Sequence, residues 1–168
     1  MPILVRPDDL TDPAVQELVA EHLQGMQQFS PPGHVHALAV ANLRAPGITF
    51  LTAWLDGQLC GCGALKALGP DAGEIKSMRT KAAFLRRGVG QAVLDTIERT
   101  ARTRGYRHLY LETGTGPAFD AAHKLYLRSG FAFCGPFGDY RATEFNVFMS
   151  KVLADPSTTA RIPAPDLL

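Results

Sequence analysis

The chain has 168 residues, of which 46% are hydrophobic and 20% are charged, and its net charge at pH 7 is +1. This length corresponds to one globular domain, and the near-neutral charge argues against nucleic-acid or membrane binding through a global field. The first ten residues have no apolar signal-peptide region, and three cysteines, an odd number, fit a reducing compartment. We therefore expect a cytoplasmic protein with neither nucleic acid nor a membrane as partner.

The first half of the chain is predicted to form a strand, two helices and a hairpin. The first helix opens at Asp12-Pro13, and Gly25 with residues 30–33 is predicted to form a loop. Asp56-Gly57 favours a type I′ turn between two apolar strands. The predicted strands are residues 3–6, 48–55 and 58–65, and the second helix is residues 35–43.

The second half alternates strands and helices. Residues 73–80 and 107–112 are predicted strands joined by a crossover helix at 88–104, so they should run parallel. A helix at 118–129 and strands at 131–135 and 145–151 follow. The remaining pairs should be antiparallel, which gives an α+β fold. Residues 1–153 should form one domain, and 154–168 a proline-containing tail.

A glycine-rich segment precedes the crossover helix, where free backbone N–H groups and the helix dipole favour phosphate. The segment contains Arg86, Arg87, Gly88, Val89, Gly90, Gln91 and Ala92. A glycine-softened helix start with solvated arginines would look the same. A dinucleotide site is disfavoured, because Val93 occupies the third glycine position and a hairpin precedes the segment.

Three ordered motifs make the chain resemble the GNAT superfamily of acyl-CoA N-acyltransferases. They are Gly73–Arg79 (GEIKSMR), Arg86–Gly90 (RRGVG) and Leu125–Phe131 (LYLRSGF), supported by LETG at 111–114 and CGPFGDY at 134–140, as in one bacterial branch. The resemblance covers about residues 3–153. It implies a mixed, mostly antiparallel sheet with a splayed parallel pair at its centre and helices on both faces.

The resemblance also implies acetyl-CoA as cosubstrate and assigns its contacts. Backbone N–H groups of residues 86–92 would bind the pyrophosphate. The backbone of Met78, Arg79 and Thr80 would pair with the pantetheine arm. The family's usual Gln or Arg three residues before the first glycine is Leu85 here, and a common asparagine is Phe119, so pyrophosphate affinity would depend more on Arg86.

Three residues are candidates for proton transfer. Tyr126 matches the family's tyrosine near the thioester sulfur and is the predicted general acid, with a core-edge aromatic as the alternative. A protonated amine is not a nucleophile, so a group must accept its proton. Glu74 and Glu112 are the candidate bases, Glu74 being narrowly preferred, and either is also explained as a solvated strand-end carboxylate.

The acceptor pocket and the cysteines complete the predicted site. Ser30, His36 and Tyr140 are candidate acceptor-binding residues. Cys60 and Cys62 lack further ligands at metal spacing, and strand alternation would point both into the core from the same face, so we expect no metal. The acceptor would be a small-molecule or peptide amine, which the sequence does not identify. Family members often form homodimers, but the sequence indicates no surface for one.

The sequence therefore predicts an N-acetyltransferase in which the amine attacks acetyl-CoA directly within a ternary complex. The first alternative is a non-catalytic acyl-CoA-binding sensor module. The second is a nucleic-acid-binding module that uses the helix arginines, which the interspersed acids Asp95 and Glu98 disfavour.

Overall fold

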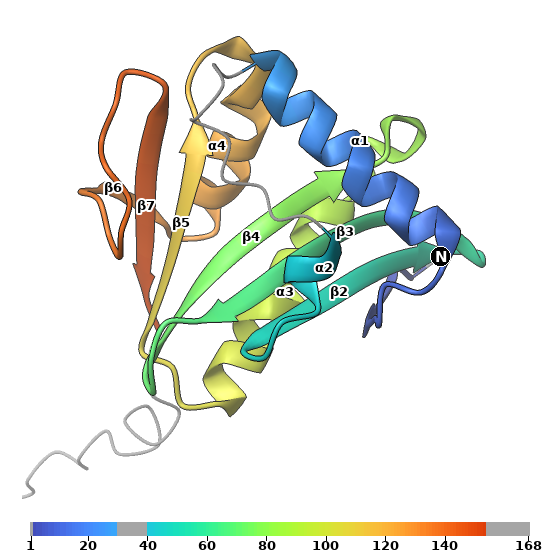
Figure 1. Cartoon of the computed structure of the whole chain (residues 1–168), viewed down its shortest axis with the longest axis horizontal. Helices are drawn as coiled ribbons and strands as arrows, with labels where there is room; N and C mark the ends of the chain where they lie inside the picture. Colours follow the sequence, from blue (N-terminus) through green and yellow to red (C-terminus); the bar gives the residue numbers. More distant parts are fainter. Residues whose placement is uncertain (1, 30–39, 154–168) are drawn as a thin grey trace, which may run out of the picture.

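The computed structural model describes residues 2–29 and 40–153 (Figure 1). The predicted tail, Ser30, His36 and the first part of the predicted second helix lie outside the described residues. No helix in the described part of the chain is both long and apolar enough to cross a membrane.

The centre of the structure is a seven-stranded sheet in the order β1-β2-β3-β4-β5-β7-β6. Among the described strands, only β4 and β5 run parallel, and every other neighbouring pair is antiparallel. The predicted α+β fold with one central parallel pair is thus confirmed. The strands are β1 Leu4–Pro7, β2 Ile48–Leu55, β3 Gln58–Ala67, β4 Ala72–Thr80, β5 His108–Gly114, β6 Ala132–Cys134 and β7 Asn146–Val152.

Helices cover both faces of the sheet (Figure 1). Each face has its own hydrophobic core beneath the helices. The helices are α1 Pro13–Phe29, α2 Val40–Leu43, α3 Val89–Thr103 and α4 Asp120–Arg128, with 3₁₀ turns η1 Ala82–Phe84 and η2 Pro117–Phe119. Val93 and Ile97 of α3 pack on one face with Leu111 of β5. Leu18 of α1 packs on the other face with Phe50 of β2. This arrangement confirms the predicted layers.

The β2–β3 hairpin has the predicted turn, since Asp56 and Gly57 have φ angles of 51° and 76°. The predicted end of the first helix is wrong, because α1 continues through Gly25 to Phe29. One internal glycine costs a helix only about 1 kcal/mol relative to alanine, which packing along the rest of the helix can offset.

The two neighbouring thiols do not share a face. Cys60 belongs to the core under α3, whereas Cys62 belongs to the core under α1. The register of β3 against β2 shifts between Ala53 and Trp54, which leaves Cys60 as an extra residue. This β-bulge reverses the alternation of side chains, so the predicted common face is wrong.

The parallel pair separates where it approaches the helix ends. Pairing between β4 and β5 runs from Ala72 with His108 to Ile75 with Leu111, although both strands continue beyond this point. On its other edge, β4 has a bulge opposite β3, and Ser77 in it adopts a φ of 57°. The strands therefore splay at the centre of the sheet.

Close packing of α3 on this region requires a glycine at position 61. A Cβ there would lie 2.6 Å from Val89 Cγ1 and 2.8 Å from the backbone oxygen of Arg79. We expect Gly61→Ala to lower the free energy of unfolding by about 1–3 kcal/mol, measured by urea denaturation. Gly135→Ala is the control, because a Cβ there meets nothing within 4 Å. Equal stability of both variants would contradict the packing argument.

Candidate active site

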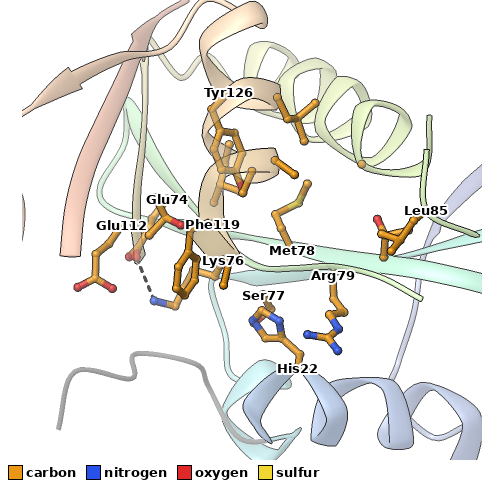
Figure 2. Close-up of a pocket in the computed structure, with 18 of the residues that line it drawn as sticks. His22, Glu74, Lys76, Ser77, Met78, Arg79, Leu85, Glu112, Phe119 and Tyr126 are labelled. Carbon is orange, nitrogen blue, oxygen red and sulfur yellow. Dashed lines mark hydrogen bonds and ion pairs between the residues drawn. The ribbon is translucent and has the colours of Figure 1, made fainter. Parts of the chain in front are cut away.

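A pocket of about 460 Å³ opens where β4 and β5 separate (Figure 2). Side chains from both faces of the sheet line it: Met78 and Tyr126 belong to the α3–α4 side, and Glu74 and Lys76 lie on the opposite face. Side chains alternate between the two faces along β4. Ile75 packs in the core under α3, so its neighbours Glu74 and Lys76 point to the opposite face. The pocket is therefore a slot that reaches both faces.

The start of α3 lies at one end of the pocket. Gly88 is the N-cap residue with a φ of 83°, and Ala92 donates the first helical hydrogen bond to its carbonyl at 3.0 Å. The amides of Val89, Gly90 and Gln91 therefore have no partner within the helix, whereas the Ala92 amide is already used. A Cβ on Gly88 would meet nothing within 4 Å, so there is open space beside the free amides.

The two arginines before this helix start are exposed. Arg86 has a φ of 63°, and the guanidinium of Arg87 lies 5.6 Å from the centre of the Phe84 ring. Of the predicted pyrophosphate segment, only Gly90 lines the pocket itself, together with Leu85 just before the segment. The segment thus lies at the rim of the pocket, where the charges of Arg86 and Arg87 are next to the free amides at the start of α3.

Three polar side chains, two of them buried, form a network on the α1 side of β4. Lys76 Nζ lies 2.9 Å from Glu74 Oε2 (Figure 2). It also donates to the Tyr140 hydroxyl at 2.7 Å. The Tyr140 hydroxyl donates in turn to Glu74 Oε2 at 2.5 Å. The side chains of Lys76 and Glu74 are only 7% and 3% exposed, so this carboxylate is shielded and already engaged by two donors.

Tyr140 comes from the segment between β6 and β7 and is held by aromatic packing. Its ring lies 5.0 Å from Phe137 and 5.9 Å from Phe148, centre to centre. Burial and the neighbouring Glu74 raise the pKa of its hydroxyl, so it remains a donor at neutral pH. The structure thus brings the predicted Tyr140 to the pocket, but in contact with Glu74.

Glu112 lies on the same face, at the separating end of β5. Burial raises its pKa from 4.5 to about 7, with Glu74 adding to the rise, while the Asn146 hydrogen bond and Lys76 oppose it. Asn146 Nδ2 donates to Glu112 Oε2 at 2.9 Å, and its Oδ1 accepts from the Thr143 amide at 2.8 Å. This carboxyl group can gain or lose a proton near neutral pH.

Tyr126 projects from α4 on the other side of the sheet (Figure 2). Its side chain is 5% exposed and packs edge-on against Phe131, with ring centres 5.8 Å apart. Burial raises the pKa of its hydroxyl, which makes no hydrogen bond with any described residue. The predicted general acid is thus a neutral phenol that lines the pocket.

His22 of α1 and Arg79 of β4 lie near each other at the edge of the pocket on the α1 side (Figure 2). Burial and the Arg79 charge lower the pKa of His22 to about 4, so the imidazole is uncharged at neutral pH. The Arg79 side chain points toward α1 because the bulge at Ser77 shifts the alternation of side chains along β4 by one residue.

The structure therefore brings eight of the sixteen predicted site residues to one pocket. Those that line it are Glu74, Met78, Arg79, Thr80, Gly90, Glu112, Tyr126 and Tyr140. Sequence reasoning missed Lys76, Ser77, His22 and Asn146. Lys76 was detectable, since two residues of spacing in a strand place it beside Glu74. Ser77 lies within the GEIKSMR motif, but the motif gave its side chain no role, and His22 and Asn146 had no sequence signal. Among described residues, no group of three or more His, Cys, Asp or Glu could hold a metal ion.

Comparisons with known proteins agree with this arrangement. Residues 14–131 match the acetyltransferase (GNAT) family. The chain is 50% identical over 151 residues to the uncharacterized N-acetyltransferase YedL of Escherichia coli, covering 90% of this chain and 95% of that one. It is also 50% identical over 149 residues to the uncharacterized N-acetyltransferase YsnE of Bacillus subtilis, covering 89% and 99%.

A solved structure shares the fold. A GNAT family acetyltransferase from Elizabethkingia anophelis, crystallised with acetyl-CoA bound, superimposes with a TM-score of 0.65 at 16% identity, covering 90% of this chain and 98% of that one. Together, the matches define an acyl-CoA-dependent acetyltransferase. The chain belongs to the GNAT family.

Proposed function

We propose that the protein transfers the acetyl group of acetyl-CoA to an amine by direct attack within a ternary complex. The observation that carries this proposal is the slot between β4 and β5. A carboxyl group with a pKa of about 7 lies on one side of it, and a buried neutral tyrosine on the other. The slot thus offers a proton acceptor and a proton donor on opposite faces of one reaction centre.

Three features of the pocket fit acetyl-CoA. Beyond Ile75, the β4 edge facing β5 has no strand partner among the described residues, so its backbone can pair with an extended amide-containing arm. Ser77 Oγ is buried without a hydrogen-bond partner, as expected where a ligand supplies one. The free amides after Gly88, beside Arg86 and Arg87, suit a pyrophosphate.

We propose Glu112, rather than Glu74, as the general base. Glu74 Oε2 already accepts hydrogen bonds from Lys76 and from the Tyr140 hydroxyl, so it is less available to take a proton from the attacking amine. Glu112 has a pKa of about 7, so at neutral pH about half of it is ionised and ready to take a proton. Glu74 would then hold Lys76 and Tyr140 in place.

The proposed proton path has two ends. Glu112 removes a proton from the attacking amine, directly or through water, while the new carbon–nitrogen bond forms and the carbon–sulfur bond breaks. Tyr126 donates its hydroxyl proton to the departing thiolate and recovers one from solvent after the product leaves. A free backbone N–H of β4 beyond Ile75 would stabilise the carbonyl oxygen.

The test is an amine library incubated with acetyl-CoA, with free thiol measured and the N-acetyl product identified by mass spectrometry. We expect CoA release that requires both the amine and the enzyme. Tight acetyl-CoA binding without acetylation of any amine would contradict the proposal and favour a non-catalytic sensor.

Acetyl-CoA binding should depend on the open space at Gly88. Gly88→Glu places a carboxylate beside the free amides, so we expect acetyl-CoA affinity to fall by about 30- to 150-fold in calorimetry, the equivalent of losing about 2–3 kcal/mol of charge-assisted contacts. Gly105→Glu is the matched control: it also has a positive φ, of 80°, and open space around a Cβ, but it follows the other end of α3. Equal affinities of the two variants would exclude Gly88 from the phosphate site.

A further inference from the structure

Arg79 brings a positive charge to the acceptor side of the pocket that the described residues do not compensate. The side chain is half-buried and forms no ion pair or hydrogen bond with any of them. By contrast, Lys76, on the same face of β4, is paired with Glu74. Holding a partly buried charge without a partner is costly, so such a group is suited to a ligand of opposite charge.

The neighbouring groups leave this positive charge in excess. Glu74 and Lys76 cancel each other. His22, which lies beside Arg79, is uncharged at neutral pH because its pKa is about 4. Glu112, with a pKa of about 7, carries only part of a negative charge at the same pH. The described acceptor side therefore has a net positive charge centred on Arg79.

The faces of β4 separate this charge from the cofactor. Met78 packs against the core under α3, and Thr80 Oγ1 would lie 4.0 Å from a Cβ on Gly90 near the start of that helix. Between these two residues, the Arg79 side chain projects to the opposite face, near His22 of α1. Glu112 lies on that same face, so an acceptor whose amine approaches Glu112 comes within the field of Arg79.

We propose that the acceptor is an amine that also bears a carboxylate, and that Arg79 binds this carboxylate with a ring N–H of His22 as a second donor. The inference rests on the proposed function. One guanidinium and a neutral imidazole match the single charge of a carboxylate, whereas a phosphate dianion would require further cations. Arg79 is thus a specificity-determining residue, and its backbone remains available to the cofactor.

The test compares each amino acid with its decarboxylated counterpart. Suitable pairs are L-phenylalanine with phenethylamine, and 5-aminopentanoic acid with butylamine, which place the carboxylate at different distances from the amine. We expect the carboxylated member of at least one pair to have a kcat/KM about 10- to 100-fold higher, mostly through KM, the effect of one charge-assisted contact. Equal values within both pairs would overturn the inference.

Variants of Arg79 identify the group responsible. Arg79→Gln should abolish the preference, and Arg79→Lys should retain part of it. Arg99→Gln, which removes an exposed arginine of α3, is the control and should keep the full preference. A preference that survives Arg79→Gln would exclude Arg79 as the carboxylate-binding residue.

Binding of the products tests the inference without turnover. N-acetyl-L-phenylalanine should bind to the protein–CoA complex about 10-fold or more tightly than N-acetylphenethylamine in calorimetry, and only when Arg79 is intact. The same comparison applies to the N-acetyl forms of the second pair. If no amine is acetylated, the proposed function fails, and these affinities still decide the inference. Equal binding, or no binding of either acid, overturns it.

Discussion

Glu112→Gln is expected to lower kcat/KM at neutral pH by about 10²–10⁴-fold, the usual contribution of a general base. For the native enzyme below pH 7, both the amine and Glu112 must lose a proton, so log kcat/KM should rise with a slope near 2 and then near 1 above the Glu112 pKa of about 7. The variant should show a slope near 1 throughout, because only the amine titrates. A pH series with one amine measures both slopes.

Glu74→Gln is the comparison that separates the two carboxylates. It weakens the contacts to Lys76 and Tyr140, so some loss of activity is expected, but the change of slope near pH 7 should remain. If Glu74→Gln removes that change and Glu112→Gln keeps it, Glu74 is the base.

The same titration affects stability. The folded protein holds the Glu112 proton up to about pH 7, whereas the unfolded chain releases it near 4.5. The contribution of this group to stability is therefore complete below pH 4.5 and is lost as the pH rises through 7. Relative to the native protein, Glu112→Gln should be more stable at pH 8 than at pH 4, as urea denaturation at the two pH values would show.

Tyr126→Phe is expected to lower kcat by about 10²–10⁴-fold with little change in the Kd of acetyl-CoA. The substitution keeps the ring and its edge-on contact with Phe131, and it removes a hydroxyl that has no hydrogen-bond partner among the described residues. Stability should therefore change by less than about 0.5 kcal/mol. Steady-state kinetics and calorimetry with acetyl-CoA separate the two effects.

Tyr106→Phe is the matched control, because Tyr106 is also a buried tyrosine of the core under α3 but does not line the pocket. Its kcat should stay within about twofold of the native value, as for a substitution outside the reaction centre. If Tyr126→Phe were equally active, the thiolate would leave without a proton from this residue.

Local sequence signals predicted most of the fold. Asp56-Gly57 set the turn of the hairpin, and the helix at 88–104 indicated that β4 and β5 run parallel. The end of α1 was missed because Gly25 is tolerated inside a helix. The faces of Cys60 and Cys62 were missed because a bulge depends on the register of two strands, which no single strand reveals.

The candidate site was predictable by residue type but not by role. Both Glu74 and Glu112 were expected near the splayed strands, and both line the pocket. Choosing between them requires their burial and their partners Tyr140 and Asn146, which come from distant parts of the chain. The direction of the Arg79 side chain likewise depends on a bulge that the sequence does not signal.

The separation of β4 from β5 places an unpaired strand edge inside a sheet rather than at its margin. Exposed edges at a margin recruit strands from other chains, which leads to aggregation, and natural proteins block them with charges, prolines or covering loops. Here β5 faces the free edge of β4 across the gap, so the edge lies inside the sheet and is less open to a strand from another chain than a margin is. A slender, unbranched chain with amide groups would enter such a gap more easily than a strand with its side chains. The sheet would thereby keep hydrogen-bonding capacity for a ligand without offering it at a margin to a second protein.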